Sequence, residues 1–147
     1  MSGKSKRIFL DTTPLIYFLD NDENFGEKTC RILSALFEQN VKFVSSTITV
    51  AEYLVQPYRA GNEAMVEAFW KFVKDSQMIL FPIGQSESVK AAEIRAAYRH
   101  FKLMDSLQLA TACLNGCELF LTNDRQLKQF KEIKCVTVEE WNFEVIL

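Results

Sequence analysis

The chain has 147 residues and a formal net charge of −2, from 17 Lys and Arg against 19 Asp and Glu. Hydrophobic residues make up 48% of the chain and charged residues 24%, which excludes a disordered tail, a collagen-like repeat and a disulfide-knotted mini-protein. One domain is expected at this length. The acidic balance argues against a protein that coats nucleic acid through a strongly basic surface, but it allows an enzyme with a local basic patch.

The sequence carries no sign of export or of a redox or zinc site. A basic start leads into only a short apolar run, and no apolar stretch of about 18 residues follows, so we expect a cytoplasmic protein without a signal peptide or membrane span. The only histidine, His100, lies in a polar stretch, which excludes histidine-rich zinc sites. The cysteines form no CxxC pair, and we expect them to be reduced and partly buried. They are Cys30, Cys113, Cys117 and Cys135.

The first half of the chain alternates between short apolar strands and helices. Residues 7–10 form an apolar run that predicts a buried strand ending at Asp11. Thr13 and Pro14 then resemble a helix N-cap followed by proline at the first helical position, for a helix that runs to Leu19. The next predicted elements are a helix at 26–39, a strand at 41–44, and helices at about 47–56 and 61–74, separated at Pro57 and Gly61.

The second half continues the alternation. Its predicted elements are a strand at 78–81, helices at about 86–98 and 104–114, a strand at 119–121, a short helix near 125–130 and a strand at 134–137. Short apolar strands that alternate with helices are typical of a parallel sheet covered on both faces. We therefore predict a single domain over residues 1–147, with its core at about 7–138. Its fold class is α/β, a three-layer α/β/α sandwich around a mostly parallel sheet.

Two aspartates follow the ends of predicted strands. Asp11 ends the first strand, and Asp124 comes shortly after the strand at 119–121. The sites of open α/β sheets gather at the carboxyl ends of the strands, so both positions favour a functional role. The alternative is structural, because either aspartate could instead cap the helix that follows it.

Two further carboxylates lie on predicted helices. Glu52 falls, at helical spacing, on the stripe formed by Ile48, Ala51 and Val55, where a charge is costly unless it is paired or binds a cation. Asp105 heads an apolar stripe near the start of its helix. A salt bridge for Glu52 and a favourable place at a helix N-terminus for Asp105 are the structural alternatives.

All four carboxylates are expected where the loops of one sheet edge converge. Converging carboxylates repel each other in a partly dry pocket and coexist in ionised form around a cation. Ligation by oxygen alone selects Mg²⁺ or Mn²⁺ over zinc. Such an ion can activate a water and neutralise charge on a phosphate, which is the chemistry of metal-dependent phosphodiester hydrolysis.

Four motifs together resemble the PIN-domain family, with the greatest likeness to the VapC-type toxins of toxin–antitoxin pairs. They are Leu10–Leu15 (LDTTPL), Ser46–Glu52 (STITVAE), Leu103–Ala112 (LMDSLQLATA) and Leu119–Asp124 (LFLTND). The resemblance spans about residues 7 to 138. It implies a Mg²⁺- or Mn²⁺-dependent endoribonuclease on a central parallel sheet flanked by helices. Met104 stands where many relatives have proline.

By motif, the four carboxylates match the acidic quartet of that family. The resemblance implies that Asp11 and Asp105 are the most direct metal ligands, and that Glu52 and Asp124 bind directly or through water. Two hydroxyl residues beside the quartet, Thr12 and Thr122, match family positions that could orient a water or a phosphate. Their alternative role is to stabilise turns.

The resemblance also implies that the protein forms a homodimer and that a small cognate antitoxin binds it, with the antitoxin's tail in the acidic groove. It further implies that cleavage leaves RNA products with 5′-phosphate and 3′-hydroxyl ends. Basic residues beside the quartet could line the phosphates of the RNA, or could form solvated helix faces. They are Arg95, Arg99 and Lys102 before Asp105, and Arg125 and Lys128 after Asp124.

The leading hypothesis is therefore a metal-dependent endoribonuclease of the PIN type that acts as a toxin. The alternative from another class is a PIN-like module that binds RNA or a protein and no longer cuts. A phosphotransfer domain with Asp11 as nucleophile is disfavoured, because Thr13 stands where an Asp-x-Asp motif needs its second aspartate.

Overall fold

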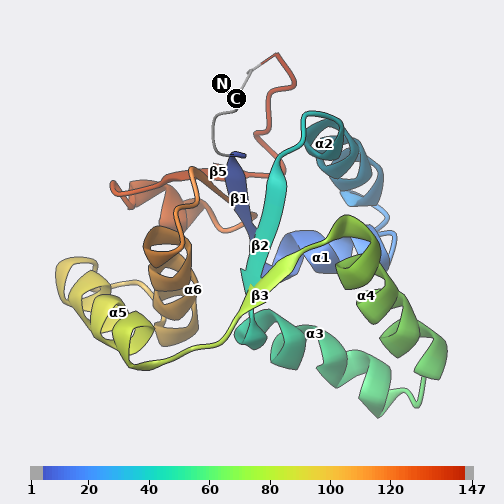
Figure 1. Cartoon of the computed structure of the whole chain (residues 1–147), viewed down its shortest axis with the longest axis horizontal. Helices are drawn as coiled ribbons and strands as arrows, with labels where there is room; N and C mark the ends of the chain where they lie inside the picture. Colours follow the sequence, from blue (N-terminus) through green and yellow to red (C-terminus); the bar gives the residue numbers. More distant parts are fainter. Residues whose placement is uncertain (1–4, 145–147) are drawn as a thin grey trace.

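A computed structural model of the chain describes residues 5–144, so part of the basic N-terminal segment lies outside the described residues. Five parallel strands form one sheet in the order β3-β2-β1-β4-β5 (Figure 1). The strands are β1 (Arg7–Leu10), β2 (Lys42–Ser46), β3 (Ile79–Phe81), β4 (Leu119–Thr122) and β5 (Lys134–Thr137). None of the helices in residues 5–144 is long and apolar enough to cross a membrane.

The helices occur in the predicted places, with ends that shift by up to three residues. They are α1 (Thr12–Leu19), α2 (Gly26–Glu38), α3 (Thr47–Arg59), α4 (Glu63–Ser76), α5 (Gln85–Ala97), α6 (Leu103–Leu114) and the short 3₁₀ helix η1 (Arg125–Gln129). The four cysteines are free thiols. Three of them are buried or half-buried, but Cys30 is exposed, against the prediction.

The start of α1 differs from its prediction. Asp11, not Thr13, is the N-cap, and its side chain accepts a hydrogen bond from the backbone N–H of Thr12. Pro14 therefore occupies the third helical position instead of the first. This is tolerated because the N–H groups of the first turn have no acceptor within the helix. The shift places the carboxylate of Asp11 at the junction of β1 and α1.

Helix α3 also continues past its predicted end. Pro57 lies inside the helix, which ends at Arg59. A proline near the C-terminal end of a helix removes one backbone donor without stopping the turn that follows. The true separation from α4 lies at Gly61, whose φ of +60° is accessible to glycine at little cost.

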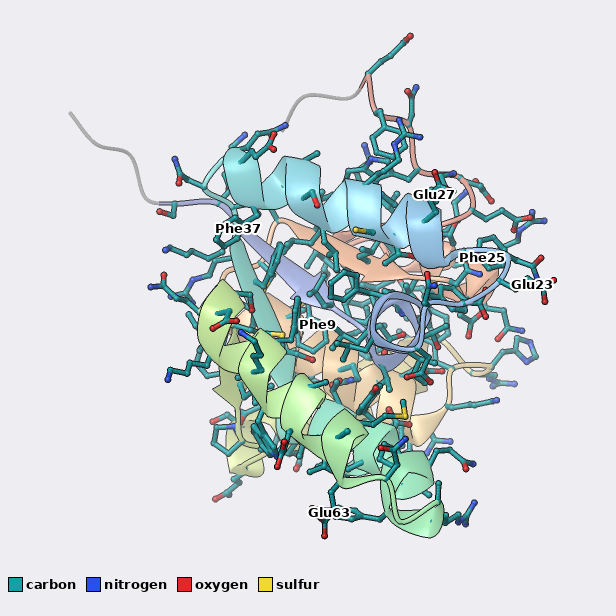
Figure 2. All side chains as sticks on the ribbon, turned by 90° about the vertical axis from the view of Figure 1, so that its right-hand side faces the viewer. Phe9, Glu23, Phe25, Glu27, Phe37 and Glu63 are labelled. Atoms are coloured by element: carbon teal, nitrogen blue, oxygen red, sulfur yellow. The ribbon has the colours of Figure 1, made fainter. Side chains whose placement is uncertain are left out.

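Apolar side chains of alternate strand residues build one core on each face of the sheet. Phe9 belongs to the core beneath α5 and α6, where its ring stacks on that of Phe120 at 5.0 Å. Ile8 and Leu10 belong to the opposite core, which includes residues of α1 and α2. Figure 2 shows α2 and α4 in front of the sheet on this second side, with Phe9 behind them. The predicted three-layer α/β/α architecture is confirmed.

The strand order defines where a site can form. The chain runs from β1 outward through β2 to β3, and then crosses to β4 on the other side of β1. In open parallel sheets, ligands bind at the carboxyl ends of strands, at the point where the order reverses. In this sheet that point lies between β1 and β4. Asp11 and Asp124 follow these two strands.

Candidate active site

Asp11 lies where the strand order reverses, between β1 and β4, which is the switch point of the sheet. Both of its carboxylate oxygens accept a hydrogen bond. Its Oδ1 accepts the Thr12 N–H at 2.9 Å, and its Oδ2 accepts the Thr122 hydroxyl at 2.9 Å. Its own backbone N–H donates to the Leu121 carbonyl at 2.9 Å, which carries the pairing of β1 and β4 one residue beyond the strands. The side chain is 8% exposed. It is therefore both buried and fixed in direction.

Burial raises the pKa of Asp11 from 3.8 to about 6. The hydrogen bonds from Thr122 and Thr12 lower this pKa, while the charges of Asp105 and Glu52 raise it further. The ionised carboxylate is thus destabilised by its surroundings, because two hydrogen bonds do not replace its lost hydration. A bound cation would offset that cost.

Thr122 connects two of the candidate carboxylates. Its hydroxyl donates to Asp11 and accepts the backbone N–H of Asp124 at 3.1 Å. The side chain of Asp124 is half-buried and caps η1 by accepting the Gln126 N–H at 3.0 Å. The structural alternatives for Asp11 and Asp124 therefore occur as well: both aspartates act as N-caps. One carboxylate oxygen of Asp124 has no hydrogen-bond partner among residues 5–144.

Glu52 reaches the site from α3, but it does not lie on a buried face of the helix, as the apolar stripe predicted. Ala51, Glu52 and Val55 are exposed, so this stripe does not face the core. The buried residues of α3 are Thr49, Tyr53, Leu54 and Pro57. Tyr53 and Leu54 pack with Phe69 of α4 in a small core of their own. A three-residue apolar pattern could not reveal which side α4 would cover.

Asp105 lies half-buried in the first turn of α6. Burial raises its pKa, the charges of Asp124 and Glu52 raise it further, and the charge of Lys102 lowers it. The charges of Asp105 and Glu52 thus act on Asp11, and those of Asp124 and Glu52 act on Asp105. The convergence of all four side chains on one cation stays a prediction.

The donor set suits a hard cation. Within residues 5–144, no three His, Cys, Asp or Glu side chains lie close enough together to ligate one ion. Mg²⁺, however, is usually held by one or two carboxylates and keeps several waters. Asp11 and Asp105 offer oxygen ligands in surroundings that raise both of their pKa values. The residues therefore fit Mg²⁺ or Mn²⁺ by their chemistry.

Four buried polar residues beside the site were not predicted from the sequence. Ser45 and Ser46 end β2, Thr49 lies in the first turn of α3, and Gln108 lies on α6, and all are at most 1% exposed. The sequence pattern that could have revealed such residues is a polar side chain inside an apolar run. Gln108, for example, stands between Leu107 and Leu109. No buried side-chain N or O atom of the described residues lacks a hydrogen-bond partner.

The five basic residues fall into two groups. Arg95, Arg99 and Lys102 are exposed and form no ion pair within residues 5–144, and the two arginines line a pocket on α5 together with Leu103. The second group is already paired with acidic residues. Arg125 contacts Glu139 at 3.2 Å and Glu140 at 3.4 Å, and Lys128 pairs with Glu140. His100, which lies in a polar stretch of the sequence, is exposed.

The family model of the PIN domain matches residues 8–133, and the chain therefore belongs to the PIN-domain family. A similar curated protein is the Ribonuclease VapC1 of Aquifex aeolicus (strain VF5). It is 28% identical over 148 residues, which cover 94% of this chain and 97% of that protein. The resemblance to VapC-type members of the family is thereby confirmed.

Solved structures show the same fold. VapBC2 from Rickettsia felis, bound to a DNA fragment from its promoter, matches with a TM-score of 0.74 at 15% identity, over 89% of this chain and 98% of that chain. FitAcB from Neisseria gonorrhoeae matches with a TM-score of 0.68 at 22% identity, over 91% of this chain and 99% of that chain. A toxin–antitoxin complex from Klebsiella pneumoniae matches with a TM-score of 0.67 at 21% identity, over 89% of this chain and 97% of that chain.

Proposed function

We propose that this chain is a Mg²⁺- or Mn²⁺-dependent endoribonuclease and the toxin of a toxin–antitoxin pair. The family, and the name of the VapC1 relative, support ribonuclease activity. The observation that carries the proposal is the state of Asp11. It is a buried carboxylate at the sheet's switch point, with a pKa raised to about 6 and with Asp105 and Glu52 near enough to raise it. Such a site is unfavourable for a protein that has no cation to place there.

Asp11 and Asp105 would hold the metal, and Glu52 and Asp124 would bind it directly or through water. A bound Mg²⁺ or Mn²⁺ supplies a water of lowered pKa as nucleophile and neutralises charge on the phosphate. Thr122 keeps Asp11 in one orientation through its hydrogen bond to Oδ2. By the resemblance, Thr12 and Thr122 would also orient a water or a phosphate, and cleavage would leave 5′-phosphate and 3′-hydroxyl ends.

The RNA backbone would contact the exposed basic residues. Arg95, Arg99 and Lys102 have no acidic partner among the described residues, and their exposed heads can bind phosphates directly. Arg125 and Lys128 can do so only by exchanging their contacts with Glu139 and Glu140. These pairs are exposed to solvent and therefore weak, so a phosphate can replace them.

A small antitoxin protein is the proposed partner. Three of the solved neighbours are described as VapBC or toxin–antitoxin assemblies, and their fold is that of this chain. We propose that the antitoxin's tail enters the acidic groove at the carboxyl ends of β1 and β4. A homodimer in the cytoplasm is the expected state of the toxin without its antitoxin.

The test is cleavage of labelled total RNA by the purified, antitoxin-free chain. The reactions contain EDTA, Mg²⁺ or Mn²⁺, and Asp105→Asn is purified in parallel to expose any contaminating nuclease. The proposal predicts cleavage that requires the metal and is lost in Asp105→Asn. Cleavage by the variant at the wild-type rate would show that the site is assigned wrongly. A folded wild type that binds the metal and cuts no RNA would favour the silent binding module.

A further inference from the structure

A line of buried hydrogen bonds runs from α6 to the carboxylate of Glu52. Gln108 Nε2 donates to Thr49 Oγ1 at 2.8 Å, Thr49 Oγ1 lies 3.1 Å from Thr12 Oγ1, and Thr12 Oγ1 donates to Glu52 Oε1 at 2.6 Å. Gln108, Thr49 and Thr12 are buried, whereas Glu52 is exposed. The line thus extends from the interior to a candidate metal ligand on the surface.

The number of protons fixes the direction of these hydrogen bonds. A hydroxyl group has one proton, and the proton of Thr12 is given to Glu52. Thr12 must therefore accept at its contact with Thr49, and Thr49 must donate there. Thr49 has then used its only proton, so it can only accept from the amide of Gln108. Every donor in the line points toward Glu52.

The amide of Gln108 is itself held in one orientation. Ser46 Oγ accepts the Ile48 N–H at 3.1 Å, and its own proton goes to Gln108 Oε1. The amide nitrogen must therefore face Thr49. Ser45 supplies a side branch as a donor, because its one hydroxyl proton is shared between two acceptors, Thr49 Oγ1 and the Leu10 carbonyl, each at 2.8 Å. Hydrogen bonds aligned in one direction strengthen one another in a buried site.

The line ends on one carboxylate oxygen only. Glu52 Oε1 accepts from Thr12, and Oε2 has no hydrogen-bond partner within residues 5–144. A glutamate on the surface of a helix would otherwise occupy several rotamers, so this contact restricts where Oε2 lies. The other end of the line begins at Gln108, one helical turn from Asp105 on α6. The line therefore links the elements that carry two of the candidate ligands.

We propose that Gln108 and Thr49 are positioning residues, which hold the Glu52 carboxylate in the orientation that the metal requires. This inference rests on the proposed function, because it assumes that Glu52 binds the metal directly or through water. Both residues are buried and act only through the hydrogen bonds between them and Glu52. Loss of the hydrogen-bond partners that orient a metal ligand commonly costs roughly 10- to 100-fold in metal affinity or activity.

Thr49→Val and Thr49→Ser test the proposal as a pair. Valine has the shape of threonine without the hydroxyl, whereas serine keeps the hydroxyl. The Kd for Mn²⁺ is measured by calorimetry in the absence of RNA, and the melting temperature and RNA cleavage are measured on the same samples. We expect Thr49→Val to weaken Mn²⁺ binding about 10-fold or more and Thr49→Ser to restore most of it. If Thr49→Val does not fold, Gln108→Met interrupts the same line and is expected to weaken binding similarly.

Thr111→Val is the matched control. The Thr111 hydroxyl is also buried on α6, but it donates to the Leu107 carbonyl at 2.8 Å and lies outside the line. We expect this variant to melt at a lower temperature and to bind Mn²⁺ like the wild type. A lower melting temperature with unchanged Mn²⁺ affinity in Thr49→Val as well would overturn the proposal, since the hydroxyl would then only stabilise the fold.

A double-mutant cycle shows whether Thr49 acts through Glu52. In a Glu52→Gln background, Thr49→Val should weaken Mn²⁺ binding little further, because the ligand it positions is already gone. An equal loss in both backgrounds would contradict the proposal. A wild type that neither binds Mn²⁺ nor cuts RNA would overturn the proposed function, and this inference with it. A wild type that does both, with a Thr49→Val that matches it, would overturn this inference alone.

Discussion

The hydroxyl of Thr122 donates a 2.9 Å hydrogen bond to Asp11 Oδ2, across the carboxyl ends of the neighbouring strands β4 and β1. The same hydroxyl accepts the backbone N–H of Asp124. One threonine therefore sets the direction of one candidate ligand and the position of another. This contact exists because the strand order places β4 directly beside β1, although more than 100 residues separate them in the sequence.

Replacing Asp11 by asparagine should abolish cleavage and stabilise the metal-free protein. The pKa of Asp11 is raised from 3.8 to about 6, so its ionised form disfavours the folded state at neutral pH. A shift of this size corresponds to at most about 3 kcal/mol, and we expect a gain of about 1–2 kcal/mol in the free energy of unfolding. Urea denaturation in EDTA measures it. A less stable Asp11→Asn would contradict the assigned cost of ionisation.

The pH dependence of the free energy of unfolding should reveal the raised pKa of Asp11. The folded-state pKa of about 6 lies above the unfolded value near 3.8, so the folded state binds the proton more tightly. The contribution of Asp11 is therefore fully present below about pH 3.8 and is lost as the pH rises through 6. The stability of the wild type minus that of Asp11→Asn should rise on acidification across this window. Two parallel curves would rule out a raised pKa at Asp11.

Removing the Thr122 hydroxyl should weaken the metal site. Thr122→Val leaves Asp11 Oδ2 without its donor, which raises the pKa of Asp11 further because that hydrogen bond lowers it. We expect Mn²⁺ affinity to fall roughly 10-fold or more at neutral pH, and the loss to grow as the solution is acidified. Thr122→Ser keeps the hydroxyl and serves as control. Equal affinities for the valine and serine variants would show that the hydroxyl does not matter.

The two basic groups should differ in their effect on RNA binding. Arg99→Ala removes an unpaired charge, so we expect a higher KM for RNA, an unchanged kcat and a salt dependence reduced by about one unit of slope. Arg125→Ala should have the smaller effect on KM, because Arg125 is already paired with Glu139 and Glu140. Arg31→Ala on α2, whose guanidinium lies over the Phe143 ring, is the control. A larger increase in KM for Arg125→Ala than for Arg99→Ala would indicate that the RNA binds along η1 instead.

The strands, the helices and the places of Asp11, Asp105 and Asp124 at strand ends or helix starts could be predicted from the sequence, because apolar periodicity and strand ends are local patterns. The exposed side of α3 could not be predicted, because it depends on where α4 packs through Phe69. The role of Gln108 could not be predicted either. Its partners Ser46 and Thr49 lie about 60 residues away, and only the β2–α6 contact brings them together.

Binding of Mn²⁺ to the metal-free protein most directly tests whether these carboxylates share one cation. Calorimetric titration of the wild type, Asp11→Asn and Asp105→Asn, all checked for folding, measures stoichiometry and affinity without RNA. We predict one Mn²⁺ site per chain in the wild type and a loss of that site in both variants. A wild type that binds no Mn²⁺, or variants that bind it as tightly as the wild type, would contradict a metal site built on Asp11 and Asp105.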